Sequence, residues 1–94
     1  LNMDAPEILH SAAECITDRG AQCDQPNGER SMGRAVAAFN ALTGNHLSER
    51  DGWLFMVALK AARAATPSGR HNADDYVDGA AYMALAGESA ERAQ

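Results

Sequence analysis

Apolar residues recur at intervals of three and four along most of this chain, which is the spacing of one face of an α-helix. Together with the turn residues, the pattern predicts four helices, over about residues 5–19, 29–43, 49–65 and 73–86. No segment alternates apolar and polar residues over any length, so no strand is predicted. The sequence therefore predicts a single all-α, four-helix domain over residues 4–87, with residues 1–3 as an N-terminal remnant outside the fold.

Capping residues mark where three of these helices begin. Asp4 with Glu7, and Ser48 with Asp51, have the three-residue spacing of a capping box, and Asn72 precedes the last helix as a cap. At the other ends, glycines predict that the first helix stops near Gly20 and the last at Gly87. Residues 88–94 are then a frayed tail.

The third predicted helix carries the run Trp53-Leu54-Phe55-Met56-Val57-Ala58-Leu59, which is apolar on every side. A helix without a polar face is buried on most sides, so we expect it at the centre of the domain and in contact with another subunit. Much of the 46% apolar fraction is alanine, which buries little area per residue. We therefore expect a thin core and a homo-oligomer, most simply a two-fold dimer.

The charge balance argues against nucleic acid as a direct partner. The formal net charge is −5, with 13 acidic and 8 basic residues, whereas binding to a phosphate backbone needs an excess of Lys and Arg. The two cysteines lack the C-x-x-C spacing, which favours a reducing compartment. No apolar run approaches the ~20 residues that span a bilayer, so we expect a cytoplasmic protein without a membrane partner.

The candidate site consists of two charged pairs. Lys60 and Arg63 lie three residues apart near the end of the third predicted helix, and Asp75 and Asp78 have the same spacing near the start of the fourth. Antiparallel packing of these helices would bring the pairs together. Lys60 and Arg63 can then contact a phosphate, and the two aspartates can hold Mg²⁺. Three glutamates are candidates by charge for a further metal ligand: Glu14, Glu29 and Glu49.

The same residues also have a purely structural interpretation. Acidic residues in the first turn of a helix stabilise it by about 0.3–1 kcal/mol against the helix dipole without any ligand. Lys60 lies in an apolar stretch, where a lysine either extends to solvent or pairs with a carboxylate and so fixes the register of two helices. His71, in the link beside the aspartates, is expected on the surface. The sequence leaves the phosphate site and the structural ion pairs as alternatives.

Four stretches carry a resemblance to known proteins: GERSMG from Gly28, AVAAFNALTG from Ala35, GWLFMVALKAAR from Gly52 and DDYVDGAAYMALAGE from Asp74. Together they cover most of the chain, roughly residues 8–88, and resemble a family of small proteins of unknown function from tailed phages and prophages. This resemblance implies a phage origin and an accessory role in the cytoplasm of the bacterial host. It implies no established activity.

A second resemblance concerns the aspartates alone. Asp75 and Asp78, followed by Tyr82, are similar to the E-x-x-D-then-Tyr helix of the all-α nucleoside triphosphate pyrophosphohydrolases of MazG type. Those enzymes use Mg²⁺ to cleave a nucleotide to its monophosphate and pyrophosphate. The E-x-x-E motif that supplies the rest of their metal site has no counterpart on the first two predicted helices.

These observations leave three hypotheses for function. The leading one is a divergent MazG-like phage protein that binds or hydrolyses a nucleotide with Mg²⁺. The second is a non-catalytic effector that binds a host protein, in which the charged cluster is structural. The third is a sponge that sequesters a nucleotide signal without a metal. Whether the protein is an enzyme stays open.

Overall fold

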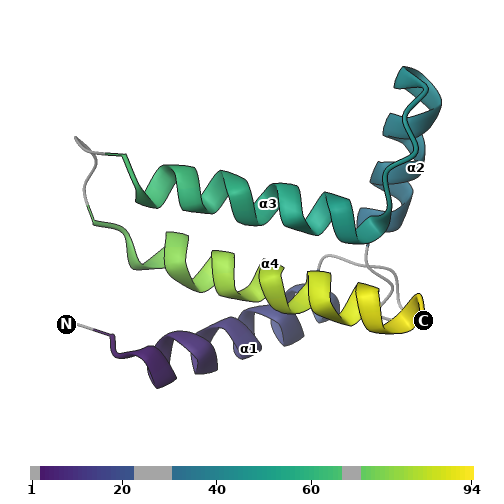
Figure 1. Ribbon diagram of the computed structural model, residues 1–94. Helices are drawn as coiled ribbons and strands as arrows, with labels where there is room; N and C mark the ends of the chain where they lie inside the picture. Colours follow the sequence, from purple (N-terminus) through teal and green to yellow (C-terminus); the bar gives the residue numbers. More distant parts are fainter. Residues whose placement is uncertain (1–2, 23–30, 67–70) are drawn as a thin grey trace.

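The structure is a computed structural model that describes the backbone of residues 3–22, 31–66 and 71–94, and their side chains except those of 18–22. It contains four helices: α1 (Ala5–Gln22), α2 (Met32–Thr43), α3 (Glu49–Ala64) and α4 (Ala73–Arg92) (Figure 1). No strand occurs within the described ranges. The prediction of a four-helix, all-α domain is therefore confirmed.

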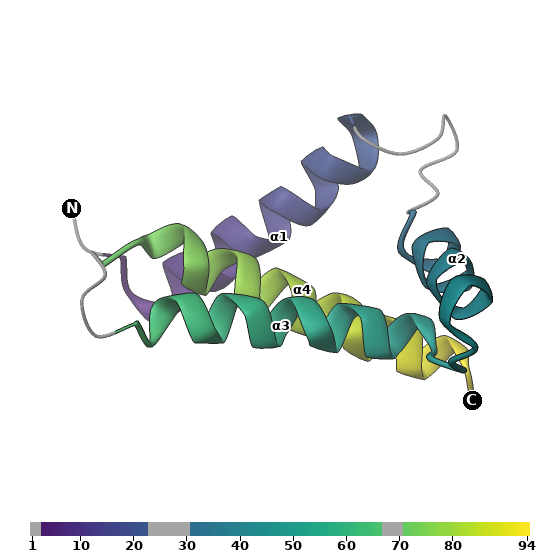
Figure 2. The ribbon, with the colours of Figure 1, turned by 90° about the horizontal axis from the view of Figure 1, so that it is seen from above.

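Helix α4 forms the centre of the arrangement. It runs antiparallel to α3 on one side and packs against α1 on the other, while α2 contacts α3 alone among the described helices (Figures 1 and 2). We predicted that the third helix would be central, and this prediction is wrong. The reason is that α4 presents alanines and other small residues on two sides, so that two helices can approach it closely.

The core consists of two small clusters that share α4. Ala12 of α1 packs against Val77 and Ala81 of α4. On the other side of α4, Trp53 of α3 packs against a second pair, Leu85 and Ala86. The core is thin, as the alanine content predicts, because few large apolar side chains take part in it.

The apolar run of α3 is mostly exposed. Trp53 is buried, but Leu54 and Leu59 are exposed and 70% of Phe55 is accessible to solvent. The expectation that this helix is buried on most sides is therefore wrong for a single chain. Helix α4 covers one side of α3, and α2 meets α3 near the start of α3, so the remaining sides have no described neighbour.

Helix α2 packs on the N-terminal end of α3 and stands away from α1 and α4 (Figure 1). Its end is defined by Gly44, which adopts the left-handed conformation (φ 75°) and donates its backbone N–H to the carbonyl of Asn40. The Asn40 side chain also donates to the carbonyl of Leu47 (2.9 Å) and accepts from the Leu47 N–H (3.0 Å). These bonds hold the link between α2 and α3 against α2.

The predicted helix starts are confirmed by their hydrogen bonds. Asp4 and Glu7 each accept from the other's backbone N–H, and Ser48 and Asp51 do the same at the start of α3. The Asn72 side chain accepts from the backbone N–H of Asp74, two residues into α4.

Two predicted helix ends are wrong. Helix α1 continues past Gly20 to Gln22, and α4 continues through Gly87 to Arg92, so residues 88–92 of the predicted frayed tail are helical. The last turn of α4 is tied to the start of α3, since Arg92 Nη2 lies 2.8 Å from Glu49 Oε2. The predicted start of the second helix at Glu29 lies outside the described residues. No described helix has the length and apolar content needed to cross a membrane.

Candidate functional site

The two charged pairs converge where α3 ends and α4 begins. Lys60 Nζ lies 3.1 Å from Asp78 Oδ2, and Arg63 Nε lies 3.6 Å from Asp75 Oδ1. The pairs follow one another along the helices because the residues of each helix are three apart and the helices are antiparallel. The structure thus brings together all four residues that the sequence singles out. Their roles toward phosphate and metal stay predictions.

The four side chains differ greatly in exposure. Those of Lys60 and Asp78 are only 13% and 14% exposed, so this lysine does not extend to solvent. Asp75 is buried, whereas the Arg63 side chain is 56% exposed and reaches Asp75 from the surface. The cluster therefore contains one enclosed ion pair and one that is open on its arginine side.

A groove of about 450 Å³ runs beside this cluster, between α3 and α4, and is open to solvent. Lys60, Asp75 and Tyr76 lie along it. The other lining residues are small or aliphatic and come from both helices: Val57, Ala61, Ala64, Ala65, Gly79 and Ala80. The site thus combines charged groups with an apolar wall, which is the usual composition of a small-molecule site.

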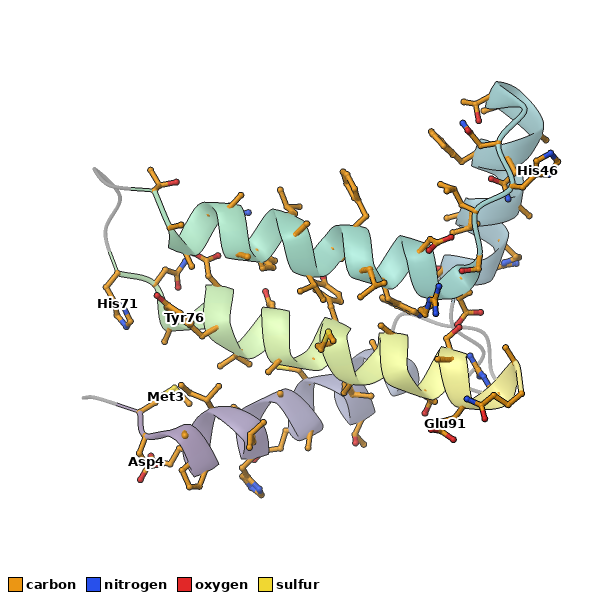
Figure 3. The ribbon with its side chains drawn as sticks, viewed as in Figure 1. Met3, Asp4, His46, His71, Tyr76 and Glu91 are labelled. Carbon is orange, nitrogen blue, oxygen red and sulfur yellow. The ribbon has the colours of Figure 1, made fainter. Side chains whose placement is uncertain are left out.

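Tyr76 is a residue of this site that we did not predict. Its ring is about half exposed and stacks on His71, with ring centroids 5.7 Å apart, at the end of the molecule where α4 begins (Figure 3). His71 is on the surface, as predicted. The alanines at intervals of three and four in α3 could have indicated the groove wall, but the same spacing is typical of close helix packing.

Of the three glutamates proposed as further metal ligands, the two that the structure describes do not join the site. Glu14 pairs with His10 on the exposed surface of α1 (2.9 Å), and Glu49 pairs with Arg92 at the opposite end of α3. Glu29 lies outside the described residues. Within the described part of the chain, no group of three or more His, Cys, Asp or Glu residues could hold a metal ion.

Tyr82, the third residue of the D-x-x-D-then-Tyr pattern, packs toward the core. Its ring stacks on Trp53, with centroids 5.8 Å apart, and it contacts the cluster formed by Trp53, Leu85 and Ala86. This tyrosine therefore contributes to the contact between α3 and α4 near the middle of α4.

Chemically, the cluster can recognise an anion through Arg63. A guanidinium has five N–H donors in a planar fork, and the 3.6 Å separation from Asp75 is longer than a hydrogen bond. A phosphate approaching from solvent would meet this exposed group first. Lys60 could contribute only if its bond to Asp78 were exchanged for one to the ligand.

Comparison with known proteins identifies a family for this chain but no activity. The model of one family, described as a domain of unknown function (DUF6378), matches residues 7–90. The match therefore includes the whole charged cluster and all four helices, apart from the first two residues of α1 and the last two of α4. No curated protein and no solved structure matches the chain significantly.

Proposed function

Because the chain belongs to the DUF6378 family, whose function is unknown, we propose a function from the site itself: it binds a nucleotide or another phosphorylated metabolite in the groove between α3 and α4. The proposal rests on the exposed guanidinium of Arg63, which faces Asp75, a residue that lines the mostly apolar groove together with Lys60. Arg63 contacts the phosphate directly, and Lys60 joins it by exchanging its bond to Asp78 for one to the ligand.

The groove has room for such a ligand. Small-molecule sites enclose roughly 300–1,000 Å³, and this groove has about 450 Å³. Its alanine and glycine walls can accept the apolar part of a ligand, and the half-exposed ring of Tyr76 can stack against a base. A nucleotide would thus place its base toward the wall and its phosphate toward Arg63.

Mg²⁺ fits this site only together with a phosphorylated ligand. Mg²⁺ commonly takes one or two carboxylates and completes its coordination with waters and phosphate oxygens. Asp75 and Asp78 can supply the two carboxylates, once Lys60 and Arg63 turn toward the phosphate. The bound ion would activate water and neutralise phosphate charge, which is the chemistry that hydrolysis requires. Hydrolysis is therefore the part of the proposal that depends on the metal.

Two further parts belong to the proposal. The sequence resemblance to small phage proteins implies an accessory role in the bacterial cytoplasm, and on separate grounds we propose that the protein is a homo-oligomer. The thin core and the exposed apolar residues of α2 and α3 support the oligomer, since a small domain with little buried area gains stability by association.

A thermal-shift panel of nucleotides, with and without Mg²⁺, tests this function. A ligand present at 100 times its dissociation constant should stabilise the protein by about 2.7 kcal/mol. Arg63→Gln should abolish that shift, whereas Arg50→Gln, which changes an exposed arginine near the start of α3, should retain it. Chromatography of the same mixtures detects release of the monophosphate.

The outcomes separate the hypotheses. A shift that needs Mg²⁺ and is accompanied by product supports the enzyme, and a shift without metal supports the sponge. If no nucleotide shifts the melting temperature, the enzyme and the sponge are both excluded. The non-catalytic effector that binds a host protein is then the remaining hypothesis. One observation favours that second candidate: each cation of the cluster already faces a carboxylate, which is what a purely structural cluster requires.

A further inference from the structure

Helix α3 has an apolar stripe that no described helix covers. Phe55, Ala58, Leu59 and Ala62 are spaced as successive residues of one helix face, and all four are exposed. Trp53 and Lys60, which contact α4, mark the opposite side of the helix. The stripe is therefore a second apolar face of α3, turned away from the core.

Helix α2 has an apolar stripe that is covered along only half of its length. Met32 and Val36, in its first half, lie against Gly52 of α3. The stripe continues to Phe39 and Leu42, which are 46% and 86% exposed. This half of α2 projects beyond α3 on the side away from α4 (Figure 1). We call the exposed stripes of α2 and α3 together the apolar face.

Apart from Ala62, the apolar face lies in two segments of the chain that carry no charge. Residues 35–48 and 52–59 contain no Asp, Glu, Lys or Arg, although the chain has 21 charged residues in all, 13 acidic and 8 basic. Two copies of a chain with a net charge of −5 repel each other, and this repulsion opposes contact least where neither surface carries a charge. A partner recognised through opposite charge would find no charged residue in either segment.

The size of the face also suits association of two copies. Taking about 200 Å² for a fully exposed phenylalanine and somewhat less for leucine, its four large side chains present on the order of 450 Å². A stable dimer buries about 800 Å² on each protomer, of which about 56–65% is apolar. The apolar face therefore supplies about the apolar area that a dimer needs.

Building on the homo-oligomer proposed above, we infer that a second copy of this chain covers the apolar face about a two-fold axis, with α2 of each protomer packed along α3 of its partner. A two-fold interface uses the same surface on both protomers, and each chain has both halves of this one. The exposed end of the α2 stripe covers residues 39–42, or about 6 Å of helix, and so fits within the α3 stripe, which covers residues 55–62, or about 12 Å. The result is a shared bundle of two α2 and two α3 helices.

Light scattering coupled to size-exclusion chromatography tests this interface. We expect the wild-type chain to elute with twice its 9.9 kDa mass, and Leu42→Glu and Phe55→Glu to weaken dimerisation by at least about 100-fold. Both side chains are largely exposed in the single chain, so these substitutions leave the monomer fold intact, which circular dichroism verifies. Leu9→Glu is the matched control, because Leu9 is 63% exposed on α1, and it should remain dimeric.

Two results would overturn the inference. A wild-type chain that stays monomeric at 100 times the concentration needed for detection would show that a second copy does not cover the apolar face. A dimer that survives both glutamate substitutions would show that copies associate through a different surface. Neither result depends on nucleotide binding, because the groove between α3 and α4 can be tested with the ligand panel on monomer and dimer alike.

Discussion

Lys60 of α3 and Asp78 of α4 form an enclosed ion pair, with Nζ and Oδ2 3.1 Å apart and both side chains less than 15% exposed. The pair joins the last turns of one helix to the second turn of the next. Because a charge held away from water needs its partner, this contact favours a single register between α3 and α4. The same pair therefore serves the fold whether or not a ligand binds beside it.

We expect Asp78→Asn to destabilise the protein by about 2 kcal/mol, because it leaves the Lys60 ammonium without its charged partner in an enclosed position. The free energy of unfolding in urea measures this effect. Asp74→Asn changes an exposed aspartate in the first turn of α4, and it should lower the free energy of unfolding by no more than about 0.5 kcal/mol. Replacing the pair with Lys60→Met and Asp78→Leu together should recover most of the loss. Equal urea midpoints for wild type and Asp78→Asn would contradict the prediction.

The capping box of α3 should make stability depend on pH. The Ser48 backbone N–H, then the Ser48 hydroxyl, and finally Arg50 hold the pKa of Asp51 below its ordinary value. A lowered carboxyl pKa stabilises the folded state above the unfolded pKa, which is about 3.9, and this contribution is lost as the pH falls through the folded pKa. We therefore expect the melting temperatures of wild type and Asp51→Asn to differ more at pH 6 than at pH 2.5.

Nuclear magnetic resonance titration of Asp51 checks the cause. Ser48→Ala removes the hydroxyl but keeps the backbone donor, so the Asp51 pKa should rise only part of the way toward its ordinary value. A titration of Asp51 at its ordinary pKa in the wild type would show that the capping box is not formed in solution.

The contact between α2 and α3 should be sensitive to a single methyl group. A Cβ on Gly52 would lie 2.5 Å from Met32 Sδ and 2.8 Å from Val36 Cγ2, so Gly52→Ala should push α2 away from α3. Met32 can turn aside, but the buried and branched Val36 cannot do so easily. We expect Gly52→Ala to lower the free energy of unfolding by about 1–2 kcal/mol and to speed amide hydrogen exchange throughout α2.

Gly87→Ala is the matched control for this substitution. Nothing lies within 4 Å of a Cβ at Gly87, which is an exposed position inside α4. Alanine has a higher helix propensity than glycine, so this variant should be more stable than wild type by up to about 1 kcal/mol. A loss of stability in Gly87→Ala would argue that α4 ends before this residue.

Local signals in the sequence were sufficient to predict the four helices and the starts of α1, α3 and α4. Ser48 and Asn72 form caps with groups two or three residues away, so their bonds do not depend on the rest of the fold. The end of α4 is different. Gly87 is a local stop signal, but the bond between Arg92 and Glu49 joins residues far apart in sequence, and no local pattern contains it.

The candidate site also has features that follow from local sequence and features that depend on how the helices pack. The convergence of Lys60 with Asp78 could be predicted because helix spacing and a short link determine it. The sequence could not predict which helix is central, because an apolar run such as that of α3 does not indicate which element covers it. Tyr76 and the groove also depend on how closely two alanine-rich helices approach, which is a property of the packing.

The order of the helices has a consequence for how the chain reaches this fold. Helices α3 and α4 are joined by a short link, whereas α1 reaches Val77 and Ala81 from the other end of the chain. Closing a short loop costs less entropy than closing a long one, so we expect the α3–α4 hairpin to assemble first and α1 to dock late. A nascent hairpin would then expose two small apolar residues, Val77 and Ala81, until the N-terminal helix arrives to shield them.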